Sequence, residues 1–168
     1  MNVQALPRVA VSQISGSVRA IAAPPHEGSA RIVDLAAALT LSGDELLSVA
    51  EALSILELAQ VDEGTLKLTA AGRVFAQANA SERKRLFREH LLEFVPLAAH
   101  IRRTVSEQEG HVVPAKHFLS ELQRHLPLAE AQRTLRVAAA WGRHAGLFDL
   151  DGRRHVFNIP AQPAAKTA

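Results

Sequence analysis

The sequence of 168 residues contains no cysteine and no tyrosine, and aromatic residues make up only 4% of it. Without cysteine the chain can form no disulfide framework, no thiolate metal site and no cysteine nucleophile. Because aromatic side chains are scarce, the core must consist mainly of leucine, alanine and valine. The hydrophobic fraction of 48% is large enough for one domain of ordinary size or two small units packed together.

Long apolar runs and nucleotide-binding loops are also missing. No segment approaches the roughly 20 apolar residues needed to span a bilayer. The N-terminal region has Arg8 and Arg19 but no continuous apolar stretch of a secretory signal. No GxxxxGK[ST] motif occurs, so these residues cannot hydrolyse ATP by the P-loop mechanism. We expect a cytoplasmic, non-enzymatic protein that needs no cofactor and does not insert into the membrane.

The formal net charge of +2 hides an uneven distribution. Residues 1–80 contain 5 Lys and Arg against 8 Asp and Glu, whereas residues 81–168 contain 14 against 9. Seven of the 8 histidines also lie in the second part. The two parts therefore face different electrostatic environments or partners.

Residues 41–72 predict a helix followed directly by a hairpin. Ser42 or Asp44 can cap the helix, in which apolar residues recur at helical spacing. Residues 58–61 and 65–68 then alternate apolar and polar side chains around a turn that contains Gly64. A helix that leads into a small hairpin is the central part of a winged helix-turn-helix unit.

The same order returns near the C-terminus. Residues 133–145 predict a helix, and residues 147–150 and 155–159 predict two strands joined by a turn at Asp151-Gly152. We therefore predict a mainly α fold with two small β-hairpin wings, at about 58–68 and 147–159. The chain would form two tandem winged helix-turn-helix units.

The predicted boundaries follow from helix-breaking residues. Residues 1–8 form a lead-in, 9–80 the first unit, 81–159 the second unit, and 160–168 a disordered tail rich in alanine and proline. Pro96 interrupts a long helical stretch that begins at Ser81, so we expect a kink or two abutting helices there. The other helices are expected at 9–22, 31–39, 70–78, 114–126 and 128–145.

Two basic clusters are candidates for binding a partner. The first lies at the start of the long helical stretch and consists of Arg83, Lys84, Arg85 and Arg88. Its simplest interpretation is a solvated helix face whose charge neighbouring glutamates balance. The second lies in one sector of the last helix and in the second wing. It is the best candidate for a nucleic-acid surface and consists of Arg133, Arg136, Arg143, Arg153, Arg154 and His155.

The corresponding helix of the first unit is acidic and would repel phosphate; it carries Asp44, Glu45, Glu51 and Glu57. This charge favours protein contacts over DNA. Val137 and Trp141 form an i, i+4 pair on the last helix. They either pack one unit against the other or anchor a partner protein. The second interpretation follows from the enrichment of Trp at interface hot spots. The candidate partner-binding residues are Arg83, Arg85, Arg88, Arg136, Trp141 and Arg143.

His117, Glu121 and His125 are spaced i, i+4 and i+8 on one predicted helix. Imidazole and carboxylate are suitable zinc ligands, but three groups at this spacing cover too much length to reach one ion easily. A polar helix face is the simpler interpretation. A metal or ligand site would need a further group from elsewhere, such as His90, His100 or His111.

Several stretches resemble the AAA-associated C-terminal domain that follows the ATPase domain in some ABC importers of the nitrate, sulfonate and taurine type. The most specific are the runs ERKRLFRE at 82–89 and WGRxAxLF at 141–148, in that order and spacing. Weaker matches include the LTxxGR run at 68–73. The resemblance covers roughly residues 6–155. His144 departs from it, because the family pattern has an aromatic tyrosine there.

The resemblance implies a regulatory or interaction module that contacts an ABC transporter ATP-binding subunit or domain, at the inner face of the cytoplasmic membrane. It supplies no catalytic residues. Two other functions stay open: a winged-helix transcription regulator that binds DNA through the basic second unit, and a sensor that binds a ligand or metal through its histidines.

Overall fold

The computed structural model describes residues 3–160. Of the predicted tail at 160–168, residues 161–168 lie outside the described residues. The described chain is mainly helical, with two small antiparallel sheets of three strands each. None of its helices has the length and apolar character that crossing a bilayer requires.

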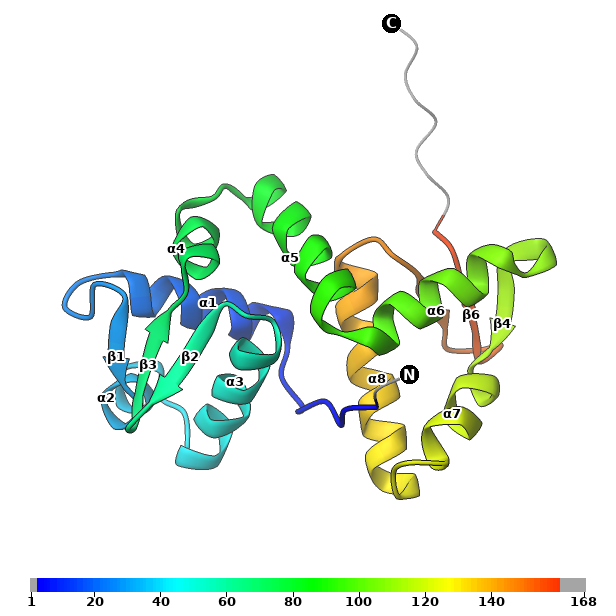
Figure 1. Cartoon of the computed structure of the whole chain (residues 1–168), viewed down its shortest axis with the longest axis horizontal. Coiled ribbons are helices and arrows are strands. Elements are labelled where there is room, and N and C mark those ends of the chain that lie inside the picture. The colour runs from blue at the N-terminus through cyan, green and yellow to red at the C-terminus, as the bar shows by residue number, and fades with distance from the viewer. Residues whose placement is uncertain (1–2, 161–168) are drawn as a thin grey trace, which may run out of the picture.

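Six elements of the first part build the first sheet and the helices around it (Figure 1). In chain order they are α1 (Val11–Ala22), β1 (Ser29–Arg31), α2 (Ile32–Leu39), α3 (Gly43–Ile55), β2 (Ala59–Asp62) and β3 (Thr65–Leu68). The strand order is β1-β3-β2, which places the last strand in the middle.

The second part repeats this order of elements. It contains α6 (Pro96–Glu107), β4 (Val112–Pro114), α7 (Ala115–Gln123), α8 (Leu128–His144), β5 (Asp149–Asp151) and β6 (Val156–Asn158), with a single 3-10 turn at Glu109–His111 after α6. The strand order β4-β6-β5 matches that of the first sheet. From here on, the first and second units are residues 11–68 and 96–158, which contain the repeated elements. They are narrower than the predicted units 9–80 and 81–159 because α4 and α5 lie outside the repeat.

Two helices connect the units. α4 (Ala70–Gln77) follows the first sheet, and α5 (Ala80–Phe94) comes next, running diagonally downward from the top of Figure 1 to the second unit. Val95 has extended backbone angles, and Pro96 begins α6. The predicted break at Pro96 is confirmed: proline tolerates the first turn of a helix but not its interior.

Local signals set several helix ends. Ser42 accepts a hydrogen bond from the backbone N–H of Glu45 at 3.1 Å, and Glu45 reaches back to the N–H of Ser42 at 2.7 Å. Thr69 caps α4 with a single hydrogen bond, which its side chain accepts from the N–H of Gly72 at 3.0 Å. Both predicted hairpins are confirmed, with Asp62 opposite Thr65 and Asp151 opposite Val156.

The sequence prediction missed the strands β1 and β4. The helix expected from residue 31 begins at Ile32, because Arg31 ends β1 and pairs with Thr65. The helix expected to reach residue 126 ends at Gln123. The segment before α1 packs closely: Leu6 is 1% exposed and Val9 is 5% exposed. Since α1 begins only at Val11, we extend the term lead-in to residues 3–10. In Figure 1 this dark-blue segment runs from α1 to α8.

Candidate functional site: a basic cleft between α5 and α8

Four positively charged side chains line a hollow where α5 meets the C-terminal end of α8. The hollow has a volume of about 710 Å³. We call it the basic cleft and define it by its five charged lining residues, Lys84, Arg85, Arg88, Arg143 and Asp149. Ser81, Ala145, Gly146, Phe148 and Pro160 complete its lining.

The sequence of α5 brings three of these cations together. Asn79 caps the helix by accepting a hydrogen bond from the N–H of Glu82 at 2.9 Å. Phe87 and Leu91 are buried and set the inward face of α5. Ser81, Lys84, Arg85 and Arg88 are spaced i, i+3, i+4 and i+7, so they form one stripe beside that inward face.

Packing of α5 on α8 brings Arg143 to the same hollow. The Phe87 ring meets the Trp141 ring edge to face, with centroids 6.3 Å apart. Gly142 allows Phe148 to approach, since a Cβ at residue 142 would lie 2.2 Å from the Phe148 ring. The turn after α8 is further held by Arg88, which donates to the carbonyl of Gly146 at 3.3 Å, and by Arg102, which donates to the carbonyl of Leu147.

The positive charges of the cleft are only partly balanced. Arg85 pairs with Glu89 at 2.8 Å, and Arg143 lies 3.5 Å from Asp149. Within residues 3–160, Lys84 and Arg88 make no ion pair. Two neighbouring groups have lowered pKa values, in each case first through burial and then through a cation of the cleft. For Arg102, burial and then repulsion by Arg88 lower the pKa. Burial, and then Lys84, lower the pKa of His144.

The other predicted partner-binding residues lie outside the cleft. Arg83 turns away and donates to the carbonyl of Ala78 at 2.7 Å, at the end of α4. Arg136 is exposed beside a separate hollow of about 250 Å³ that Arg8 and Arg133 also line. The predicted nucleic-acid face of α8 is therefore divided, with Arg136 and Arg143 at different hollows.

Trp141 lies in the core. Its side chain is fully buried, and its indole N–H donates to the carbonyl of Val9 at 2.9 Å. Val137 is also buried, at 7% exposure. The structure favours the packing role for both residues, because a buried side chain offers no surface to a partner. We leave Trp141 out of the proposed binding surface.

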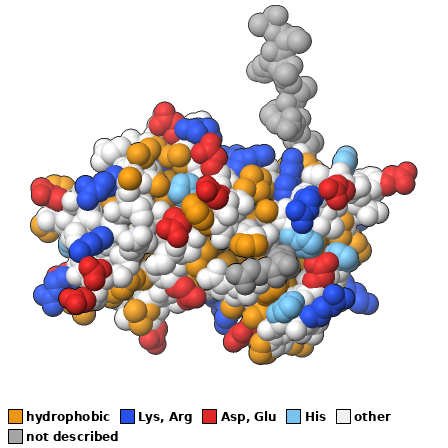
Figure 2. Space-filling view, in the orientation of Figure 1, with side chains coloured by type: hydrophobic (Ala, Val, Ile, Leu, Met, Phe, Trp, Pro, Cys, Tyr) orange, Lys and Arg blue, Asp and Glu red, His pale blue; other side chains and the backbone are white. Residues whose placement is uncertain are grey.

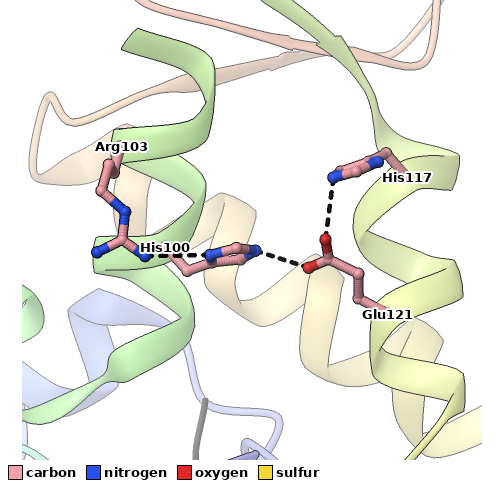
Figure 3. Close-up of polar contacts among 4 residues, drawn as sticks. All are labelled: His100, Arg103, His117 and Glu121. Carbon is pink, nitrogen blue, oxygen red and sulfur yellow. Dashed lines mark hydrogen bonds and ion pairs between the residues drawn. The ribbon is translucent and has the colours of Figure 1, made fainter. Parts of the chain in front are cut away.

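The histidine candidates assemble differently from the predicted i, i+4, i+8 series (Figure 3). His117 Nε2 lies 2.9 Å from Glu121 Oε1, but α7 ends at Gln123, so His125 follows the helix end and does not join them. The further group comes from α6: His100 Nε2 lies 2.6 Å from Glu121 Oε2. One carboxylate thus bridges two imidazoles.

The bridged side chains do not converge on one point, as metal ligands do (Figure 3). Among the described residues, no group of three or more His, Cys, Asp or Glu side chains is placed to hold a metal ion. Both imidazoles point at the carboxylate rather than with it toward a common point (Figure 3). The three side chains connect α6 to α7. In Figure 2 most of the visible pale-blue histidine surface lies over the second unit.

Sequence reasoning identifies part of the basic cleft. It predicts Arg85, Arg88 and Arg143, whereas it presents Lys84 only as part of a charged run and Asp149 only as part of a strand. The spacing from Ser81 to Arg88 along α5 is the available signal for a shared face. No sequence signal reveals that α8 supplies the opposite wall.

The family model described as the C-terminal AAA-associated domain matches residues 33–151, more than two thirds of the chain. The matched range runs from α2 to β5 and contains all five charged residues of the basic cleft. No curated protein and no solved structure gives a significant match.

Proposed function

The chain belongs to the C-terminal AAA-associated domain family, and from this premise we propose that it is a non-enzymatic regulatory module that binds an ATPase. We further propose that this ATPase is the ATP-binding subunit or domain of an ABC importer of the nitrate, sulfonate or taurine type. The module would then work in the cytoplasm, at the membrane face where such subunits sit. It would regulate the ATPase by binding it directly.

We propose that each unit is a winged helix-turn-helix. The repeated order of helix, strand, two helices and two strands supports this, as does the shared strand order with the last strand in the centre. In this arrangement α3 and α8 would be the third helices, which in DNA-binding relatives of this architecture enter the major groove.

Neither third helix suits that DNA-binding role. On α3, Asp44, Glu45 and Glu51 are exposed and would repel phosphate. The lead-in lies against α8, where Thr134 accepts a hydrogen bond from the Leu6 N–H at 3.1 Å and Arg133 donates to the Leu6 carbonyl at 3.3 Å. These observations favour protein contacts.

The observation that carries the proposal is the basic cleft inside the matched family range. Its cations are held on two packed helices, so an acidic surface could bind them without first ordering a loop. Opposite charge across an interface accelerates association and selects the partner. We therefore propose Lys84, Arg85, Arg88 and Arg143 as the ATPase-binding surface.

Two alternatives have specific support. A transcription regulator could use Arg153 and Arg154, which are exposed in the second wing. A histidine-based sensor could use the bridge of His100, His117 and Glu121. The first predicts tight, sequence-selective binding to duplex DNA at physiological salt, and the second predicts a specific ligand for the bridge.

A pull-down tests the ATPase proposal. The chain is immobilised and offered an ABC importer ATP-binding subunit from the same cell. We expect the Arg85→Glu/Arg143→Glu variant to lose binding because it reverses two cleft charges. The matched control is Arg19→Glu/Arg153→Glu, which changes the net charge equally at exposed positions outside the cleft. Undiminished binding by a correctly folded cleft variant would remove this surface from the proposal.

A further inference from the structure

We propose that the basic cleft is also a binding site for a small linear anion that carries two or more linked phosphate groups. The proposal concerns the same residues as the ATPase surface but does not depend on it, because it requires only the isolated chain. It adds a ligand to a module for which the family implies only a protein partner.

The stripe of hydrogen-bond donors on α5, which begins with the Ser81 hydroxyl and continues through the three cations Lys84, Arg85 and Arg88, favours an anion longer than one phosphate group. Ser81 and Arg88 are separated by seven residues, which corresponds to about 10 Å along an α-helix. A single phosphate group could contact only one part of this stripe. Two or more linked phosphates could extend from Ser81 to Arg88, while Arg143 lines the other wall from α8.

The N-terminal end of α5 adds donors at one end of the stripe. The cap side chain of Asn79 binds the N–H of Glu82, and the Asn79 carbonyl accepts from the N–H of Arg83. The N–H groups of Ala80 and Ser81 precede these and have no partner inside the helix. The 15-residue helix α5 also places the positive end of its dipole there.

The charge balance of the cleft favours an anion. Four cations face a single lining carboxylate, that of Asp149, which is 3.5 Å from Arg143. Asp149 would repel a phosphate at its own wall. The ligand is therefore expected on the Lys84 and Arg88 side, where the described residues supply no carboxylate partner.

The hollow has room for such an anion, and one of its cations is fixed in position. The hollow of about 710 Å³ lies within the range of about 300–1,000 Å³ usual for small-ligand sites. Arg88 is half-buried and braced on the Gly146 carbonyl, so its position is set before any ligand arrives. A preorganised cation loses less freedom when it binds.

Isothermal titration calorimetry on the full chain tests the proposal with pyrophosphate, inorganic phosphate and ADP. We expect one saturable site for pyrophosphate, with binding at least about tenfold tighter than that of phosphate because additional cations are engaged. Lys84→Gln should weaken pyrophosphate binding about tenfold. Arg19→Gln, which removes one exposed charge from α1, should leave it unchanged.

Each outcome decides one point. ADP binding as tightly as pyrophosphate, or more tightly, would support the proposal and show whether a nucleoside adds contacts. Non-saturable heats, equal affinity for phosphate and pyrophosphate, or the same loss in Arg19→Gln would overturn it. Arg143→Gln, whose side chain is 75% exposed, provides a second cleft variant if Lys84→Gln does not fold. Because no ATPase is present, failure here leaves the pull-down result untouched.

Discussion

His144 lies where its surroundings oppose protonation. Its ring packs edge to face against Phe87 with centroids 5.6 Å apart. Partial burial, and then the neighbouring Lys84, lower the pKa of His144 below its ordinary value of 6.5. A ring that titrates near neutral pH therefore occupies this packing position.

The sign of the effect on stability follows from proton binding. Below pH 6.5 the unfolded chain protonates His144 while the folded chain still holds it neutral, so the unfolded state binds more protons. We expect the melting temperature to fall as the pH drops from about 6.5, and to fall less in His144→Gln. Thermal melts at several pH values check this, with His26→Gln as the control for loss of one imidazole.

An NMR titration of the His144 ring provides the direct measurement. Lys84→Gln removes the second cause of the shift, so the pKa of His144 should move up toward its ordinary value but not reach it, because burial remains. A His144 titration at or above the ordinary value in the unmodified chain would contradict this account.

At the scale of elements, we predict opposite effects on stability for alanine substitutions at two helical glycines. Gly72 lies where α4 crosses the chain before β2, and a Cβ there would lie 2.0 Å from the backbone carbonyl oxygen of Leu58. A Cβ added to Gly16, inside α1, would meet no neighbouring atom within 4 Å. Gly72→Ala should lower the free energy of unfolding by about 1–3 kcal/mol, and Gly16→Ala should raise it by about 0.5–1 kcal/mol.

Urea denaturation of both variants measures the difference. Each serves as the control for the other, because the same methyl group is added to a helical glycine in both. A Gly72→Ala variant as stable as the original chain would mean that α4 can shift away from Leu58 without cost.

The elements recovered from sequence are those with strong local signals. Ser42 with Glu45 and Thr69 with Gly72 form side-chain caps that a short sequence window contains in full. The strands β1 and β4 have three residues each, with one buried side chain at the centre, Ala30 or Val113. Three residues are too few to show an alternating pattern, and each strand forms only because β3 or β6 pairs with it.

The same limit applies to the candidate site. The α5 stripe is local, so its cations can be predicted together. Arg143, more than 50 residues later, joins them only through the packing of α5 on α8. The sequence predicts His125 on a shared helix face because nothing before Pro127 marks the end of α7 at Gln123.

At the scale of the whole molecule, the lead-in connects the two units. It leaves α1 of the first unit and lies along α8 of the second, where Leu6 and Val9 are buried. Thr134 and Trp141 each hydrogen-bond its backbone, at the N–H of Leu6 and the carbonyl of Val9. The sequence shows no reason to expect this, because a short lead-in without periodicity resembles a frayed end.

The last prediction tests whether the lead-in holds the units together. Thr134→Val keeps the shape of a fully buried side chain but removes the acceptor for the Leu6 N–H, leaving a buried donor unpaired. We expect a loss of about 1–3 kcal/mol in the free energy of unfolding. Trp141→Ala removes a fully buried indole together with its bond to Val9 and should cost about 3–5 kcal/mol.

Hydrogen exchange distinguishes a local effect from a global one. If the lead-in is a structural tie, the Leu6 amide should exchange slowly in the unmodified chain and much faster in Thr134→Val. Val61→Ala, at a side chain that is 51% exposed on β2, should change stability by no more than about 0.5 kcal/mol and leave Leu6 exchange as it was. Rapid Leu6 exchange in the unmodified chain would mean that α5 and its packing on α8 join the units without help from the lead-in.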